Sequence, residues 1–279
     1  MITPNNLSKA LELSALGALF VVNHSGGKDS QRMLIELLSQ ESIPRRQILV
    51  VHASLGDVEW PGAMELARDQ AAAAGVAFLV ARAPKTFMEM VDRRFAARPD
   101  VPAFPQAGNR QCTSDLKRDP IMREVRRYAK ANGFTTIITC MGLRAAESPK
   151  RAKMATWTKS ARGSVAGRSW FEWLPIHAMS TAEVFAGIAA AGQAPHYAYA
   201  AGNERLSCVF CIMGSGSDTR IGAIHHPELY AQYVAAEQRT GYTMHMSRKS
   251  LPQITGLTVE QARAEHRRLP LYGLKGTGT

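Results

Sequence analysis

The sequence predicts an α/β protein with a doubly wound parallel sheet of about five strands and a helical, cysteine-containing C-terminal extension. Two observations support this prediction. Short apolar runs typical of buried strands alternate with segments of helical spacing before residue 150. A glycine-rich segment follows the first apolar run, at residues 25–30, where open parallel sheets place their ligand loops. Alternating strands and helices of this kind cover both faces of a sheet with helices.

Four apolar runs are the expected strands, and they span residues 18–23, 47–52, 76–81 and 135–141. Helical spacing or alanine-rich composition predicts helices at residues 7–17, 31–39, 62–74, 86–97 and 121–132. Gly75 and Gly133 follow two of these segments and suit helix C-terminal caps. The prolines of residues 99–110 predict a loop.

The pattern changes after residue 150. Residues 150–169 are basic and contain glycines, so we expect a loop or a flexible lid there. Helices are expected at residues 181–191, 227–239 and 258–268. We therefore divide the chain into an α/β domain at residues 1–165, which carries the glycine-rich loop, and a C-terminal helical subdomain at residues 166–279.

Composition narrows the range of functions. The net charge is +11, from 34 Lys and Arg against 23 Asp and Glu, which favours polyanionic partners such as nucleic acid. No apolar run reaches the roughly 18 residues of a membrane span. The first residues lack the basic start and apolar core of a signal peptide, so we expect a cytoplasmic protein without a membrane partner.

The loop at residues 25–30 has the features of a phosphate-binding site. Its two glycines, Gly26 and Gly27, let backbone N–H groups approach an oxyanion closely. The helix that follows presents its N-terminus, which attracts anions. Lys28 adds a positive charge and Ser25 and Ser30 add hydroxyls, while Asp29 could orient the loop or hold a metal ion.

Further polar residues are expected at the same edge of the sheet. Gly142 directly follows the fourth expected strand, and Arg144 and Arg151 come soon after it. Two guanidinium groups there could clamp phosphate or sulfate oxygens, although both could also be solvated surface residues. The same two interpretations apply to Lys117.

The four cysteines point to a metal site or to redox chemistry, because structural disulfides are rare inside cells. Cys208 and Cys211 form a Cys-x-x-Cys pair. Cys112 and Cys140 are expected near the same edge of the sheet, although Cys140 could be an ordinary core thiol. Converging thiolates suit zinc or an iron–sulfur cluster, and a redox dithiol is a third possibility.

The loop Ser-Gly-Gly-Lys-Asp-Ser resembles the SGGxDS loop of the ATP pyrophosphatase superfamily, which holds the pyrophosphate of ATP. Four more segments resemble the phosphoadenosine phosphosulfate (PAPS) reductase family and its ATP-using relatives, the DNA phosphorothioation sulfurtransferases. These segments are RQCTSDLKRDP (110–120), GLRAAESPKRA (142–152), LPIHAMSTAEVF (174–185) and RLSCVFC (205–211). The resemblance covers roughly residues 18–215 and implies the Rossmann-like fold of the adenine nucleotide alpha-hydrolases.

The resemblance also implies a [4Fe–4S] cluster. Some members of the family hold one on a Cys-Cys pair and a later Cys-x-x-Cys. Cys112 matches the first residue of that pair, whereas Thr113 stands at the second. Cys140 is then the candidate fourth ligand, or one iron is left open, where it could bind a sulfide.

Three departures from the family pattern bear on function. No cysteine follows Cys211, and the reductases act through a cysteine near their C-terminus. Those reductases usually lack the lysine found here as Lys28. Both departures favour ATP as the substrate. In many relatives an Asp ends the second strand, but here Ser54 stands near that place, and Asp57 or Glu59 could substitute.

The sequence therefore predicts an ATP pyrophosphatase-type enzyme that uses ATP and Mg²⁺, adenylates a substrate and supports iron–sulfur-dependent sulfur transfer to a nucleic acid or nucleotide. A sulfur donor protein such as a cysteine desulfurase would be its partner. The expected catalytic residues are Lys28, Asp29, Arg144 and Arg151, and the expected nucleotide-binding residues are Ser25, Gly26, Gly27, Lys28, Asp29, Ser30 and Gly142. One alternative is a sulfonucleotide reductase that produces sulfite. Another is a nucleic-acid-binding subunit without turnover.

Overall fold

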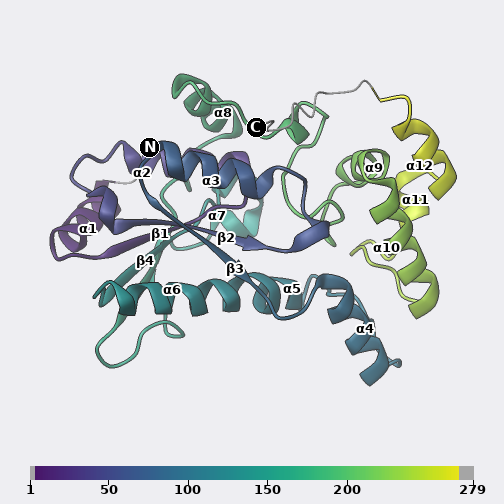
Figure 1. Ribbon diagram of the computed structural model, residues 1–279, viewed down its shortest axis with the longest axis horizontal. Coiled ribbons are helices and arrows are strands. Elements are labelled where there is room, and N and C mark those ends of the chain that lie inside the picture. The colour runs from purple at the N-terminus through teal and green to yellow at the C-terminus, as the bar shows by residue number, and fades with distance from the viewer. Residues whose placement is uncertain (1–3, 270–279) are drawn as a thin grey trace, which may run out of the picture.

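A six-stranded sheet forms the centre of the computed structural model, which describes residues 4–269 (Figure 1). The strand order is β3-β2-β1-β4-β6-β5. Neighbouring strands are parallel except for β5, which runs antiparallel to β6. The strands are β1 (Leu19–Asn23), β2 (Ile48–Ser54), β3 (Ala77–Arg82), β4 (Thr136–Cys140), β5 (Trp157–Lys159) and β6 (Ser169–Trp173). The predicted α/β class and the four predicted strands are confirmed.

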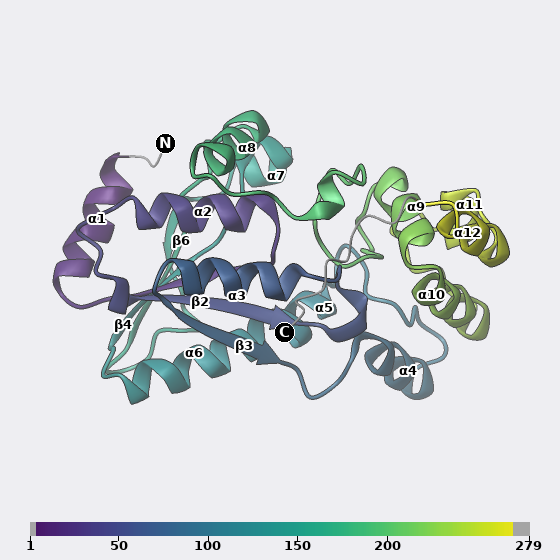
Figure 2. The ribbon, with the colours of Figure 1, turned by 45° about the horizontal axis from the view of Figure 1, so that its top comes forward.

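Helices cover both faces of the sheet, as Figures 1 and 2 show. Side chains of the helices on one face share a core with β1, β2 and β4. These helices are α1 (Pro4–Ala15), α2 (Lys28–Leu38), α3 (Ala63–Ala73) and α8 (Thr181–Ala190). On the opposite face, α6 (Asp119–Ala131) buries Met122, Val125 and Ala129 against the alternate residues of the same strands. The sheet is thus buried on both sides, which explains its continuous apolar runs.

The sheet is larger than the sequence predicted, because it includes β5 and β6. Both strands, and the short helix α7 (Pro149–Ala152), lie in or directly after the basic segment that was expected to form a loop. Successive side chains of a strand point to opposite faces. Accordingly, Trp170 of β6 packs beside α6, and Trp173 packs beside α2. The sheet therefore continues past residue 165, the predicted domain boundary, and the division into two domains remains a prediction.

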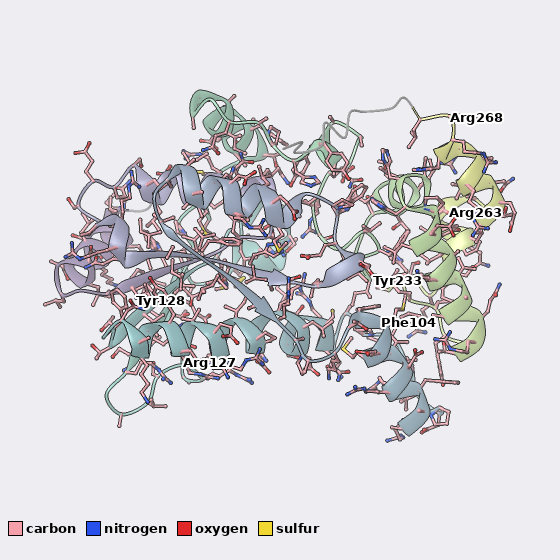
Figure 3. The ribbon with its side chains drawn as sticks, in the orientation of Figure 1. Phe104, Arg127, Tyr128, Tyr233, Arg263 and Arg268 are labelled. Atoms are coloured by element: carbon pink, nitrogen blue, oxygen red, sulfur yellow. The ribbon has the colours of Figure 1, made fainter. Side chains whose placement is uncertain are left out.

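A second group of helices lies beyond the carboxyl ends of β2 and β3 (Figure 1). Its members are α9 (Gly216–His225), α10 (Pro227–Thr240), α11 (Leu251–Thr255) and α12 (Val259–His266), and α4 (Phe87–Ala97) packs against them. Phe87 stacks on Tyr233 with ring centroids 5.5 Å apart. Figure 3 shows Tyr233 and Phe104 where α4 and α10 meet the end of the sheet.

Short turns complete the chain. A helical turn, α5 (Gln111–Thr113), runs into a π-helical segment (Ser114–Arg118) ahead of α6. The 3₁₀ turns are Arg45–Gln47, Gly56–Val58, Ala145–Glu147 and Tyr197–Tyr199. No helix within residues 4–269 has the length and apolar character that a membrane span requires.

Candidate functional site

The glycine-rich loop connects β1 to α2 at the carboxyl edge of the sheet, as predicted. Gly26 has a φ of +76°, a conformation that favours glycine. A Cβ on Gly26 would lie 2.5 Å from the carbonyl oxygen of Ala63, so α3 approaches the loop too closely for any side chain. Gly27 is the N-cap of α2, which leaves the first N–H groups of the helix facing outward. The backbone is thus shaped to present amide donors.

Lys28 is the first residue of α2, and its side chain is only 3% exposed. Its ammonium lies 3.3 Å from Asp29 Oδ2 and donates a hydrogen bond to the carbonyl of Glu204 at 3.2 Å. It also faces the ring of Tyr199, 5.1 Å from the centroid. A charge this well buried has little solvent to screen it, which strengthens its attraction for an anion at the loop.

Asp29 and Arg144 form an ion pair, with Arg144 Nε 2.6 Å from Asp29 Oδ1. Arg144 also donates to the carbonyl of Met179 and to the hydroxyl of Thr181, both at 3.2 Å. Gly142 belongs to the same group, because a Cβ there would lie 3.0 Å from the backbone of Asp29. The structure thus brings these three predicted residues together, but Arg144 is engaged by Asp29 and orients the loop.

Arg151 lies apart from the loop and pairs with Glu147. Glu147 also accepts from the backbone N–H of Arg144 at 2.9 Å and lies 3.4 Å from the guanidinium of Arg205. Burial would raise the pKa of Glu147, but these hydrogen bonds and charges lower it below its usual value. Arg144 and Arg151 are therefore linked through Glu147, and they do not form the paired clamp that we expected to face a phosphate.

The two loop serines differ in their roles. The hydroxyl of Ser30 is buried and donates to the carbonyl of Gly27 at 2.8 Å, while it accepts from the N–H of Ser25 at 3.2 Å. Ser30 therefore stabilises the turn. Ser25 is exposed, and its side chain is available to a ligand.

His24 also shapes the loop, although the sequence analysis gave it no role. Its Nδ1 accepts from the N–H of Gly26 at 3.1 Å, and its Nε2 lies 2.6 Å from Gln70 Oε1, to which it donates. Complete burial lowers the pKa of His24 to about 4, so the ring is neutral at pH 7. No local pattern marks this residue, because its partner Gln70 is distant in sequence.

A chain of contacts leads from the loop toward the cysteines. The Nδ1 of His52 lies 2.8 Å from the carbonyl of His24, and its Nε2 lies 3.0 Å from Glu59 Oε1. Glu59 in turn forms an isolated antiparallel bridge with Cys208. Glu59, which we considered as a substitute for an acid at Ser54, thus lies between the loop and the cysteine segment, whereas Asp57 is exposed.

Three of the four cysteines gather around one lysine. Cys112, Cys208 and Cys211 all lie close enough to Lys117 to raise its pKa, with Cys208 the largest contributor. Burial raises the pKa of Cys208 to about 11 and also raises that of Cys112. We refer to Cys112, Cys208, Cys211 and Lys117 as the cysteine site.

The hydroxyl of Tyr233 is buried beside the cysteine site and has no hydrogen-bond partner among the described residues. Within residues 4–269, no three His, Cys, Asp or Glu side chains are arranged as a ready-made metal site. Thiolates are nevertheless the ligands that zinc ions and iron–sulfur clusters take in proteins. The unpaired Tyr233 hydroxyl could donate a hydrogen bond to a group bound beside it. By donor type alone, the three thiols of the cysteine site suit such a group.

Cys140 does not join the other three cysteines. It is fully buried at the end of β4, in the core that contains Phe20, Met33 and Trp173. Burial raises the pKa of its thiol well above the usual value. The structure places Cys140 as a core thiol, the alternative that the sequence left open, and does not bring together the expected set of four.

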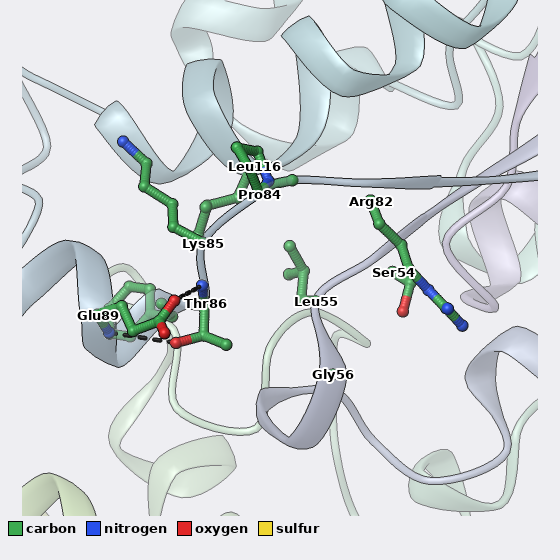
Figure 4. Close-up of a pocket in the computed structure, with 11 residues that line it drawn as sticks. Ser54, Leu55, Gly56, Arg82, Pro84, Lys85, Thr86, Glu89 and Leu116 are labelled. Carbon is green, nitrogen blue, oxygen red and sulfur yellow. Dashed lines mark hydrogen bonds between the residues drawn. The ribbon is translucent and has the colours of Figure 1, made fainter.

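A cavity of about 440 Å³ opens where β2 and β3 end. Leu55, Pro84, Phe87 and Leu116 form its apolar wall. Figure 4 shows the side chains of Arg82 and Lys85 at its rim, pointing to opposite sides. Lys85 is already paired with Asp115 at 2.8 Å. The charged groups of this cavity do not converge on one point, so it is not a candidate for the active site.

Comparisons with known proteins give one family match and one curated relative. Residues 20–213 match the family model of the phosphoadenosine phosphosulfate reductase domain. An uncharacterized 37.8 kDa protein of Escherichia phage 186 is 28% identical over 169 residues, which cover 57% of this chain and 49% of that protein. The chain thus spans about half the length of this curated relative.

The solved structures that match this chain share little sequence with it. The PAPS reductase of Candida auris, in a phosphate complex, is 13% identical and matches 72% of this chain and 86% of its own, with a TM-score of 0.45. The FMN adenylyltransferase of Candida glabrata with FAD and pyrophosphate is 11% identical and matches 69% of this chain and 55% of its own, with a TM-score of 0.42. The NAD synthetase of Campylobacter jejuni is 11% identical and matches 95% of this chain and 93% of its own, with a TM-score of 0.38.

Proposed function

The chain belongs to the phosphoadenosine phosphosulfate reductase domain family, and from that premise we propose that it is an ATP pyrophosphatase-type enzyme. In the proposed reaction an oxygen of the acceptor attacks the α-phosphorus of ATP. The bond between the α-phosphorus and the bridging oxygen breaks, and pyrophosphate leaves. The observation that carries this proposal is the loop itself, where amide donors at the N-terminus of α2 lie beside a buried lysine.

In this proposal the loop residues bind the leaving pyrophosphate. The amides around Gly26 and Gly27 and the hydroxyl of Ser25 donate to its oxygens, and Lys28 offsets its negative charge. Asp29, fixed by Arg144, offers the carboxylate closest to the loop for Mg²⁺, which would neutralise charge on the phosphates. Arg144 acts as a positioning residue.

We further propose that Cys112, Cys208 and Cys211 hold an iron–sulfur cluster. When bound, such a cluster would supply the site that handles the transferred sulfur. Lys117 would offset the negative charge of the three thiolates, and Tyr233 would donate its free hydroxyl hydrogen to the bound group. The contacts from His24 through His52 and Glu59 to Cys208 support a functional link between the two sites.

The acceptor in this proposal is a nucleic acid or nucleotide, which the net charge of +11 supports. A protein sulfur donor such as a cysteine desulfurase would complete the reaction. The relation to the DNA phosphorothioation sulfurtransferases is part of the same proposal.

The first test is anaerobic purification, with iron and sulfide measured and pyrophosphate release from ATP assayed with DNA and RNA. We expect bound iron and ATP-dependent pyrophosphate release. Lys28→Met should lower the rate about 100-fold or more, as removal of a key electrostatic contact does. Lys130→Met, which removes an exposed lysine of α6, is the matched control and should leave the rate unchanged. No pyrophosphate release with any acceptor would refute the proposal.

A second candidate is reduction of a sulfonucleotide to sulfite, which the family match favours. Its assay is sulfite release from adenylyl sulfate or its 3′-phosphorylated form with thioredoxin as the electron donor. Sulfite production without pyrophosphate release from ATP would replace the first proposal with this one.

A further inference from the structure

The glycine-rich loop, which we call the phosphate loop after its proposed ligand, is covered by a segment from the distant part of the chain. We call this segment, residues 196–206, the strap. The hydroxyl of Tyr199 accepts a hydrogen bond from the N–H of Lys28 at 2.9 Å. The carbonyl of Glu204 accepts from the ammonium of Lys28 at 3.2 Å. Two donors that a phosphate would use, the amide and the ammonium of Lys28, are thus occupied by the protein itself.

The strap lies against Gly27 as well. A Cβ on Gly27 would lie 3.2 Å from the hydroxyl of Tyr199 and 3.3 Å from the Cβ of Leu206. No phosphate could bind the amide of Lys28 while the Tyr199 hydroxyl occupies it, and even a methyl group on Gly27 would crowd Tyr199 and Leu206. Occupation of the loop therefore requires the strap to move.

The strap is anchored on both sides of the turn that carries Tyr199. The ring of His196 donates to the carbonyl of Pro61 at 2.9 Å, and the N–H of Glu204 donates to Asp218 Oδ1 at 2.8 Å. Between these anchors, Ala200 is exposed and Gly202 has a φ of +105°. The turn around Tyr199 is therefore the part of the strap that can move.

We propose that the strap is a gate on the phosphate loop, in which the Tyr199 hydroxyl mimics a phosphate oxygen and is displaced by the phosphates of an incoming nucleotide. The gate rests on the proposed function, because it presumes that the loop binds phosphate. The chain continues from the strap directly to Cys208 and Cys211.

The gate makes a quantitative prediction about affinity. A ligand that binds only the open state has an apparent affinity reduced by the fraction of open molecules. Tyr199→Phe removes the hydroxyl but keeps the ring that faces Lys28. Because the hydrogen bond from the N–H of Lys28 that holds the gate shut is lost, we expect the full-length variant to bind pyrophosphate up to about tenfold more tightly than the wild type.

The experiment is calorimetric titration of pyrophosphate with Mg²⁺ into the wild type, Tyr199→Phe and Leu206→Ala, with Tyr197→Phe as the matched control. Tyr197 lies in the same 3₁₀ turn, but its side chain is 44% exposed and contacts Trp60 instead of the loop. Tighter binding by the first two variants, with Tyr197→Phe unchanged, supports the gate. Hydrogen exchange should also accelerate in residues 196–206 when pyrophosphate is added to the wild type.

The outcomes separate this inference from the proposed function. If wild type and Tyr199→Phe bind pyrophosphate equally, the gate is overturned while ATP cleavage stands. If Tyr199→Phe binds tightly but neither protein cleaves ATP, the gate stands and the proposed activity fails. If no variant binds pyrophosphate, both are overturned. Leu206→Ala is a second, independent variant, because Leu206 also lies against Gly27. It keeps the test valid if Tyr199→Phe fails to fold.

Discussion

The phosphate loop and the cysteine site lie close together but are constructed in opposite ways. The loop comes from consecutive residues, His24–Ser30, and most of its side chains have a protein partner. The cysteine site is assembled from α5, the π-helical turn and the segment around Cys208. The Tyr233 hydroxyl of α10 lies beside it without a partner among the described residues. The side chains of the loop are thus held by the protein, whereas a buried group beside the cysteine site is not.

This difference predicts how substitutions at each site would change the stability of the protein. A loop whose backbone is fixed by close approach and buried hydrogen bonds loses stability when any part is altered. A site with an unsatisfied buried group already carries a cost, so removal of that group costs little or even stabilises the protein. The three predictions below test this contrast.

Gly26→Ala should have the largest effect and should destabilise the protein by about 4 kcal/mol. The new methyl group would overpack against the backbone of Ala63, at about 1–3 kcal/mol, and the left-handed φ adds about 1–2 kcal/mol. Urea unfolding measures the change. Gly75→Ala is the matched control, because Gly75 also has a positive φ but nothing lies within 4 Å of its Cβ position. Equal losses in the two variants would show that the approach of α3 to the loop is unimportant.

Lowering the pH should weaken the loop through His24. The pKa of His24 is about 4 in the folded protein and near 6.5 when unfolded, so the unfolded chain binds more protons between these values. Stability from this group is complete above pH 6.5 and is lost as the pH falls toward 4. At pH 5.5 the loss is about 1.4 kcal/mol.

Urea unfolding of His24→Gln at pH 7.5 and 5.5 isolates this contribution. The variant cannot gain a proton at this position, and its drop in unfolding free energy should be about 1.4 kcal/mol smaller than that of the wild type. Equal drops would mean that His24 is not held neutral by the loop.

Tyr233→Phe should have the smallest effect on the protein without iron. Because the hydroxyl has no described partner, its removal should leave the unfolding free energy unchanged or raise it by up to about 1 kcal/mol. Tyr230→Phe in the same helix is the matched control. Its hydroxyl donates to the carbonyl of Leu257 at 2.8 Å, so that variant should lose about 1 kcal/mol. A loss in Tyr233→Phe as large as in Tyr230→Phe would show that the cysteine site is already satisfied.

Local patterns predicted the central strands, their helices and the loop, because each of these depends on residues that are neighbours in sequence. They missed β5 and β6, which are short and lie within or directly after the basic segment 150–169, so no clear strand pattern marks them. They also missed the roles of His24 and Tyr199, whose partners lie far along the chain. Local patterns also placed Cys140 near the other cysteines as a candidate ligand, whereas its side chain lies in the core. A residue at the end of a strand can point into the core as easily as toward a site at the sheet edge.

The contact between Lys28 and Tyr199 joins residues that are 171 positions apart. Contacts of such long sequence separation carry a large loop-closure entropy and form slowly. During synthesis, β1, α2 and their neighbours therefore leave the ribosome long before the strap exists. The phosphate loop is therefore uncovered when it is first synthesised. The strap can cover it only after residues 196–206 have been made.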